Sequence, residues 1–256
     1  MSRFLQGGLL WAYRVVFAHG LLRYRWGQRL YFYLYDAYKL LLEAGPISQL
    51  HALVPSATLV IDVGANVGFF TRRFARWVGA QGRVIAIEPE AMNFAELSRR
   101  IASEGHSDRV VLYQAVADRA AGEVRLVINE DHPGDHRIGR DGVPVPAVTL
   151  DALLAGETRK VALIKIDVQG AEIRVLMGAE NVLTRDRPAL LVEVDPAALA
   201  RFDGDVESLL ALLYRFEYVP HALEHDGFRP LTRPTLKELL ARRSYVDVLF
   251  IANRRS

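Results

Sequence analysis

The fold is decided by one stretch of the chain, Val60-Ile61-Asp62-Val63-Gly64-Ala65-Asn66-Val67-Gly68. The apolar run in which it begins, residues 58–63, predicts a strand buried on both faces of a sheet. Gly64 permits a tight turn after this strand, and Gly68 permits a helix or a ligand to approach closely. Residues 69–77 follow as the predicted helix. A strand, a glycine turn and a helix in this order are typical of nucleotide-binding α/β domains.

The alternation of strands and helices continues along the chain. Apolar runs predict further strands at residues 83–87, 110–115, 124–128, 162–166, 189–194, 218–223 and 245–252. Helical patterns end near residue 101 and cover about residues 171–183 and 206–214. Since parallel neighbours need a crossover helix, the pattern predicts an α/β domain with a mainly parallel sheet. The stretch 129–146 is rich in Gly, Pro, Asp and His and is predicted to form a long loop.

Composition excludes several classes of protein. The chain has 256 residues, a formal net charge of +2 and no cysteine. That length can bury a full-sized core without disulfides or metals. The lack of cysteine excludes disulfides and thiolate metal sites and is compatible with the cytoplasmic location that we expect. The net charge is too small to indicate nucleic acid, so no nucleic-acid partner is expected.

Residues 1–45 are expected to form a helical segment ahead of the domain of residues 46–256. An aromatic-rich stripe recurs at helical spacing over residues 22–41, and Gly45-Pro46 ends it. No run reaches the roughly 18 apolar residues of a membrane span. Because aromatic residues alternate with arginines here, peripheral membrane contact is one reading. The reading that we favour is a cap packed on the domain or on the second subunit of a homodimer.

Five acidic residues stand at or just past the ends of predicted strands: Asp62, Glu88, Asp118, Asp167 and Glu193. In open α/β sheets, ligands bind beyond the carboxyl ends of the strands. Glu88 follows the glycine turn by roughly twenty residues and is placed to accept hydrogen bonds from a ribose diol. Asp62 would repel the pyrophosphate of a dinucleotide but suits the ammonium or sulfonium end of S-adenosylmethionine. These acids therefore favour methyl transfer over hydride transfer.

Five short motifs extend this reading to a family. In chain order they are Asp62-Val63-Gly64-Ala65-Asn66-Val67-Gly68, Ile87-Glu88-Pro89, Ala115-Val116-Ala117-Asp118, Thr149-Leu150-Asp151 and Ile164-Lys165-Ile166-Asp167-Val168-Gln169-Gly170-Ala171-Glu172. On these motifs, over about residues 59–196, the chain resembles the FkbM family of methyltransferases. One departure is Gln169, where the family usually has glutamate. This departure puts a role for a charged side chain at that position in doubt, but not the fold.

The resemblance implies a Rossmann-like class I methyltransferase fold, with a mainly parallel seven-stranded sheet whose last strand is antiparallel. Residues 245–252 could supply that strand. It also implies S-adenosylmethionine as the cofactor and a hydroxyl group as the acceptor, often on a sugar or a secondary metabolite, which suggests polysaccharide biosynthesis. The methionine end would lie on the glycine turn, the ribose on Glu88 and the adenine beside Ala117 and Asp118. The cofactor-binding residues are then Asp62, Gly64, Ala65, Asn66, Gly68, Glu88, Pro89, Ala117, Asp118 and Asp167.

Methylation of an alcohol requires that the acceptor oxygen be aligned and its proton removed. Lys165 lies two residues before Asp167 in a predicted strand, so both side chains point to the same face. A lysine in an apolar strand is costly unless paired, and Asp167, Glu172 or Glu193 could pair with it. We expect an active-site network here rather than a purely structural ion pair. His136, in the long loop, is a further candidate base, with a plain surface histidine as the alternative.

The sequence thus predicts an S-adenosylmethionine-dependent O-methyltransferase that acts on a small molecule or a glycan. Its catalytic candidates are His136, Lys165, Asp167 and Glu193. No metal is expected, because Asp167, Glu193 and Asp195 do not match a compact chelating motif. Two alternatives stay open: an NAD(P)-dependent Rossmann oxidoreductase and a cofactor-binding scaffold without turnover.

Overall fold

The computed structural model describes residues 27, 36–37, 47–128, 137–139 and 141–253. The chain divides into two units, Met1–Ser48 and Gln49–Ser256. Nearly all of the predicted helical segment 1–45, with its membrane or subunit contacts, lies outside the described residues. Among the helices that are described, none is both long and apolar enough to cross a membrane.

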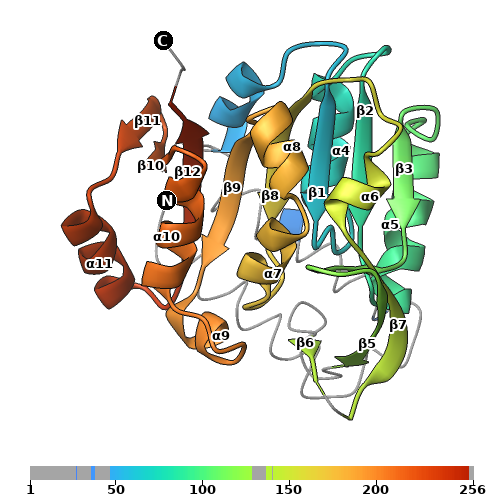
Figure 1. Cartoon of the computed structure of the whole chain (residues 1–256). Helices are drawn as coiled ribbons and strands as arrows, with labels where there is room; N and C mark the ends of the chain where they lie inside the picture. The colour runs from blue at the N-terminus through green and yellow to red at the C-terminus, as the bar shows by residue number, and fades with distance from the viewer. Residues whose placement is uncertain (1–26, 28–35, 38–46, 129–136, 140, 254–256) are drawn as a thin grey trace. The chain divides into compact units, whose positions relative to one another are not determined.

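A central sheet organises the unit Gln49–Ser256 (Figure 1). In the described part of the chain it has eight strands, in the order β11-β10-β12-β9-β8-β1-β2-β3. Their bounds are β1 Leu59–Val63, β2 Arg83–Ile87, β3 Val110–Tyr113, β8 Val161–Ile166, β9 Ala189–Val194, β10 Tyr218–Glu224, β11 Gly227–Pro230 and β12 Val246–Ala252. Strands β3, β2, β1, β8 and β9 are parallel neighbours, whereas β12 is antiparallel to both β9 and β10. The predicted antiparallel last strand is therefore confirmed.

The sheet has one strand more than the predicted seven. The additional strand, β11, pairs with the edge strand β10 as an antiparallel hairpin. Its four residues include Gly227 and Pro230 and are half-buried or exposed, so no apolar run marks it in the sequence. The helix α11 (Arg233–Arg242), of which only Leu236 is buried, was not predicted for the same reason.

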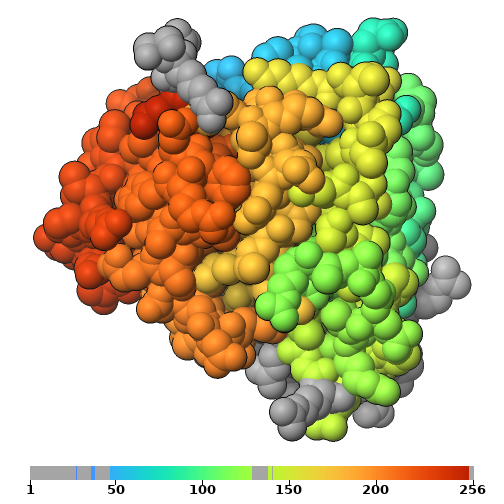
Figure 2. Space-filling model, in the orientation of Figure 1, coloured from blue at the N-terminus to red at the C-terminus, as the bar shows by residue number. Residues whose placement is uncertain are grey.

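Helices cover both faces of the sheet (Figure 1). On one face lie α4 (Phe69–Trp77) and α5 (Ala91–Ser103). On the other lie α7 (Glu172–Met177), α8 (Glu180–Arg185) and α10 (Val206–Arg215), whose side chains cover the sheet in Figure 2. The short helical segments are η2 (Ser48–Leu53), α6 (Leu150–Leu153) and α9 (Pro196–Ala200). All five residues of β1 are buried between these layers, which explains why four of them are apolar.

The predicted helix over residues 171–183 is in fact two helices, α7 and α8. The chain breaks at Gly178, where an added Cβ would lie only 2.1 Å from the carbonyl oxygen of Asp118. The second helix then starts against Asp151, whose carboxylate accepts hydrogen bonds at 3.0 Å from the N–H groups of Asn181 and Val182. A tertiary contact therefore divides what the local pattern predicts as continuous.

A second, smaller sheet includes part of the predicted loop 129–146. Its order is β4-β7-β5-β6, with bounds β4 Val116–Ala117, β5 Gly122–Val127, β6 Arg137–Ile138 and β7 Val143–Val148. In Figure 1 the strands β5, β6 and β7 lie beyond the carboxyl ends of the central strands. The loop prediction was wrong at β7 because Pro144 and Pro146 concealed an alternating pattern, in which Val145 and Ala147 are buried. Residues 129–136 lie outside the described part.

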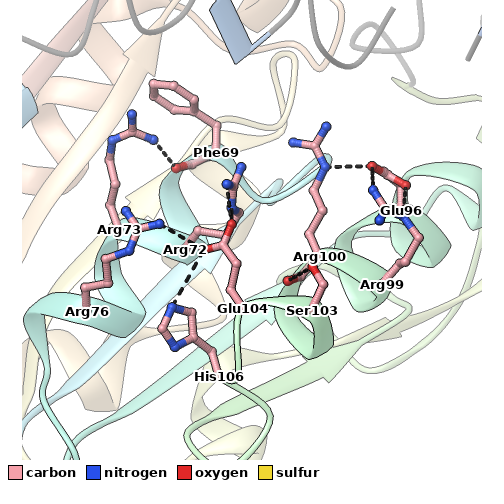
Figure 3. Close-up of polar contacts among 10 residues, drawn as sticks. All are labelled: Phe69, Arg72, Arg73, Arg76, Glu96, Arg99, Arg100, Ser103, Glu104 and His106. Carbon is pink, nitrogen blue, oxygen red and sulfur yellow. Dashed lines mark hydrogen bonds and ion pairs between the residues drawn. The ribbon is translucent and has the colours of Figure 1, made fainter. Parts of the chain in front are cut away.

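On the face of the central sheet that α4 and α5 cover, charged side chains connect these two helices (Figure 3). Glu104, which follows α5, accepts hydrogen bonds from Arg72 and from Arg76, the latter at 2.9 Å. Within α5, Glu96 holds Arg99 and Arg100 at 2.7 Å. These contacts fix the two helices whose first turns border the loops at the carboxyl edge of the sheet.

Candidate active site

The turn between β1 and α4 adopts the conformation that its glycines predict. Gly64 has a φ of 74° and Asn66 a φ of 49°. A Cβ on Gly64 would lie 1.9 Å from the carbonyl oxygen of Asp167, so only glycine allows this approach to the chain after β8. The N–H groups of Gly64 and Ala65 both donate to the carbonyl of Ile87 at 3.0 Å. The turn is thereby fixed between the ends of β2 and β8.

Glu88, the first residue after β2, closes this turn from the side. Its Oε2 accepts a hydrogen bond from the N–H of Asn66 at 2.8 Å, and its Oε1 accepts one from the N–H of Glu90 at 3.0 Å. The residue is only 5% exposed, and this burial raises the pKa of its carboxyl group to about 7 although both N–H groups lower it. Pro89 follows, and Glu90 then caps α5. The structure therefore brings Glu88 and the glycine turn together, as predicted.

Asp62 and Lys165 form the buried centre of the site. Asp62 Oδ2 accepts a hydrogen bond from the Thr71 hydroxyl at 2.6 Å, and Asp62 Oδ1 lies 3.6 Å from Lys165 Nζ. Lys165 Nζ donates to the carbonyl of Gly64 at 2.7 Å and lies 3.3 Å from Asp167 Oδ2. Burial raises the pKa of Asp62, whereas the charge of Lys165 and the Thr71 hydroxyl lower it. The predicted pairing of Lys165 with Asp167 is present, and Asp62 is a second partner that the sequence did not indicate.

Two residues of α4 complete this centre and were missed from the sequence. Besides the Thr71 hydroxyl, the ring of Phe70 lies with its centroid 5.3 Å from Lys165 Nζ, within range of a cation–π interaction. Both belong to the first turn of the helix that follows the glycine turn. That position was the available signal, because the start of such a helix lies next to the strand that precedes it.

Acidic residues continue across the carboxyl edge toward β9 and β12. In the pairing of β8 with β9, Ile166 lies opposite Val192. The next residues along the two strands are Asp167 and Glu193, and Glu193 in turn pairs with Asp247 of β12. Residues opposite each other on neighbouring strands share one face of the sheet. Asp167, Glu193 and Asp247 thus form a row on the face that also carries Lys165.

The row changes the ionisation of its central member. Burial raises the pKa of the Glu193 carboxyl group well above its usual range. The charges of Asp167, Asp247 and Glu172 raise it further, and the charge of Lys165 opposes them. The protonated form of Glu193 is thereby favoured over the carboxylate.

The loop between β8 and α7 is held by Glu172. Its Oε1 accepts hydrogen bonds from the N–H groups of Val168 at 3.2 Å and Gly170 at 3.1 Å. Between them, Gln169 takes a φ of 57°, and a Cβ on Gly170 would lie 2.2 Å from the carbonyl oxygen of Ala198. The other oxygen, Glu172 Oε2, is buried and accepts no hydrogen bond from the described residues. The acid of the motif thus fixes the loop and leaves one acceptor available.

Asp118 has a different environment from the other strand-end acids. It is 3% exposed, and its Oδ1 and Oδ2 accept hydrogen bonds from Arg174 at 2.8 and 2.6 Å. This paired contact joins the end of β4, where Ala117 also lies, to α7. Arg174 was not predicted, and no local signal marks it, because 56 residues separate the two partners.

Two further expectations concern His136 and metals. His136 lies outside the described residues. Across the ranges that the structure describes, no group of three or more His, Cys, Asp or Glu side chains could hold a metal ion.

Comparison with known proteins assigns the family. A family model described as the methyltransferase FkbM domain matches residues 62–229, more than half of the chain. The chain belongs to the FkbM methyltransferase family. The resemblance seen in the motifs is therefore confirmed, and the match includes the glycine turn, Glu88 and the Lys165–Asp167 pair.

Similar proteins are distant in sequence. Methyltransferase sdnD from Sordaria araneosa is 24% identical over 165 residues, which are 51% of this chain and 63% of that protein. The chain thus spans less than two thirds of the length of this curated relative. A putative rRNA-methylase from Clostridium thermocellum matches with a TM-score of 0.50 and 11% identity, over 84% of this chain and 97% of that one. Methyltransferase FkbM from Methylobacillus flagellatus KT matches with a TM-score of 0.47 and 17% identity, over 85% and 53%.

Membership in the FkbM family confirms two predictions, the Rossmann-like class I fold and S-adenosylmethionine as the cofactor. The described residues fit this cofactor. Glu88 offers a carboxylate beside the glycine turn, where a ribose diol binds in such folds. Glu172 Oε2 offers a buried acceptor to which no residue in the described ranges donates. The family also favours methyl transfer over the nicotinamide-dependent alternative.

Proposed function

We propose that the chain catalyses S-adenosylmethionine-dependent methylation of a hydroxyl group on a glycan or a glycosylated metabolite. The observation that carries the proposal is the position of Lys165 between Asp62 and Asp167, beside the glycine turn. One ammonium group and two carboxylates thus lie together beside the glycine turn, at the carboxyl edge of the sheet. When bound, S-adenosylmethionine supplies a methyl group that is already activated on a sulfonium sulfur.

The binding part of the proposal uses the residues around the turn. Glu88 accepts hydrogen bonds from the ribose hydroxyls, and its partner Asn66 keeps it in place. Ala117 and Asp118 border the adenine through their backbone, because the Asp118 carboxylate is already held by Arg174. The other proposed cofactor contacts come from Asp62, Gly64, Ala65, Gly68, Pro89 and Asp167.

The catalytic part concerns the proton of the acceptor hydroxyl. Asp167 and Glu193 are the proposed proton acceptors, because they lie side by side at the ends of β8 and β9. The Asp167 side chain is 27% exposed and so can be reached by an acceptor, and Lys165 fixes its orientation. The proton passes to one of these carboxylates as the new C–O bond forms. His136, on the loop outside the described residues, is the alternative base.

The acceptor side of the proposal rests on sequence. We propose that acceptor contacts come from residues 129–136 and from residues 1–45, because both stretches differ in composition from the rest of the chain. Alternating aromatic residues and arginines in the segment support contact with a membrane surface or with a second subunit. A cytoplasmic enzyme that methylates a lipid-linked glycan would use both features.

Binding and product analysis test this function. Titration calorimetry should show that the wild-type chain binds S-adenosylmethionine but not NAD. Glu88→Ala should weaken binding of S-adenosylmethionine about 10- to 100-fold, the cost of hydrogen bonds to a charged group. The exposed Glu238→Ala variant is the matched control and should bind as wild type does.

The transfer itself is followed with methyl-labelled cofactor and a panel of hydroxylated glycans. A label that resists alkaline hydrolysis identifies a methyl ether and supports the proposal. Binding of NAD instead of S-adenosylmethionine would identify an oxidoreductase. Cofactor binding with no transfer to any hydroxylated acceptor would identify a scaffold.

A further inference from the structure

Glu193 differs from the other acids of the site because it has no donor. Asp62, Glu88 and Glu172 each accept at least one hydrogen bond. The carboxyl group of Glu193 makes neither a hydrogen bond nor an ion pair with any residue in the described part of the chain. A partly buried carboxyl group in this state is stable only while it carries a proton or while a cation lies nearby.

The groups that face Glu193 come from three neighbouring elements. Asp167 at the end of β8, Asp247 on β12 and Glu172 on α7 are all acidic. The only cation that acts strongly on Glu193 from the described residues is Lys165, and its ammonium group is already shared between Asp62 and Asp167. A positive charge that enters this site would therefore affect Glu193 directly.

The fold places the cofactor close enough to do so. Strand order reverses between β1 and β8, and ligands of such sheets bind at that point. Glu193 lies two strands from the glycine turn, which is about 10 Å at the usual strand spacing. A sulfonium held above β1 or β8 would lie within about this distance of Glu193. A unit charge about 8 Å away changes a proton-binding constant by roughly 30-fold at an effective dielectric constant of about 20.

We propose that Glu193 is a charge-sensing residue of the cofactor site, which binds its proton less tightly when a sulfonium lies in the site than when it does not. This inference rests on the proposed function, because it requires a sulfonium cofactor. The fraction of Glu193 that is ionised therefore rises when a methyl donor is present. As the C–O bond forms and the S–C bond breaks, the hydroxyl proton passes to Glu193. The sulfur and the Glu193 carboxyl group then both end neutral.

The ionisation of Glu193 would also discriminate between the methyl donor and the product. S-adenosylmethionine and S-adenosylhomocysteine share the ribose, the amino group and the carboxylate, and differ by the methyl group and its positive charge. The protonated Glu193 matches the neutral thioether, and the ionised Glu193 matches the sulfonium. The ratio of the two affinities must therefore depend on pH, with the sulfonium favoured increasingly as pH rises.

Calorimetry of the full chain in two buffers of different ionisation enthalpy tests this inference. The number of protons released on binding is measured between about pH 6 and pH 9, the range in which a raised glutamate pKa titrates. We expect the wild-type chain to release more protons with S-adenosylmethionine than with S-adenosylhomocysteine. Sinefungin, which has an ammonium-bearing carbon in place of the sulfonium, should behave like S-adenosylmethionine if charge is what Glu193 senses.

In the variant Glu193→Gln, the ratio of the affinities for S-adenosylmethionine and S-adenosylhomocysteine should no longer change with pH. Glu193→Asp should keep a pH-dependent ratio, which distinguishes loss of the carboxyl group from loss of packing. Glu238→Gln, far along the sequence on the exposed side of α11, is the matched control. Equal proton release with both ligands, or an unchanged pH dependence in Glu193→Gln, overturns the inference. If neither ligand binds the wild type, the proposed function fails instead.

Discussion

The close approach of Gly64 to the chain after β8 gives the most direct test of the site. Gly64 has a φ of 74°, and an added Cβ would lie 1.9 Å from the carbonyl oxygen of Asp167. Gly105, with a φ of 69°, has no atom within 4 Å of an added Cβ. The two glycines therefore share a backbone conformation and differ in the space around them, so substituting alanine at each separates the two effects.

Gly105→Ala should cost only the strain of the left-handed conformation, about 1–2 kcal/mol of unfolding free energy. Gly64→Ala should cost the same strain plus about 1–3 kcal/mol of overpacking, because the turn or the residues after β8 must move apart. The difference corresponds to a melting temperature lower by about 2–12 °C in a domain of this size. Gly64→Ala should also weaken binding of S-adenosylmethionine. The substitution displaces the Gly64 carbonyl, which accepts a hydrogen bond from Lys165 at the centre of the site.

Thermal unfolding followed by circular dichroism measures the first effect, and titration calorimetry measures the second. Equal destabilisation by Gly64→Ala and Gly105→Ala would refute the close approach of Gly64 to the Asp167 carbonyl. Unchanged cofactor affinity in a folded Gly64→Ala variant would refute the position of the methionine end on this turn.

Three further predictions follow from the buried acids. The pKa of Glu88 rises from 4.5 to about 7 on folding, so the native state binds the additional proton and loses stability as pH rises through this interval. Relative to Glu88→Gln, the wild type should lose about 3 kcal/mol between these pH values in urea unfolding, while its cofactor affinity rises as Glu88 ionises. Arg174→Met leaves the buried carboxylate of Asp118 without its guanidinium and should cost about 3–5 kcal/mol in the same assay. Thr71→Val removes the donor to Asp62 at nearly constant volume and should cost about 1–3 kcal/mol, with weaker cofactor binding in calorimetry.

Each of these has an outcome that would contradict it. A pH dependence of stability that is the same in wild type and Glu88→Gln would mean that Glu88 is not the group that titrates. Replacement of the exposed Arg229, which pairs with Glu224, is the control for Arg174 and should leave stability nearly unchanged. Thr235, at the start of the surface helix α11, is the control for Thr71. Equal losses of unfolding free energy in Thr71→Val and Thr235→Val would mean that the hydrogen bond to Asp62 does not stabilise the fold.

Much of the fold was predictable because its signals are local. The strands β1, β2, β8 and β9 are mostly buried, so each appears in the sequence as a largely apolar run. Elements with weaker patterns were missed. The strand β7 is interrupted by prolines, and β11 is mostly outside the core.

The division of the helix 171–183 shows the limit of local patterns. Its periodicity continues across Gly178, whereas the carbonyl of Asp118 leaves no room for a side chain at position 178 and Asp151 caps the second helix. The same holds for Arg174, which no spacing rule connects to Asp118.

By itself, the sequence determined the order of strands and helices, the glycine turn, and the acids at the strand ends, including Glu88 and Asp167. Each of these depends on residues that are neighbours in the chain, so short-range patterns suffice to find them. Only the tertiary structure decided which of these acids meet: Lys165 joins Asp62 to Asp167, Arg174 engages Asp118, and Glu193 stands between two other carboxylates. The physical reason is that strand register and burial, which set these distances and pKa values, arise from contacts between segments far apart in the chain.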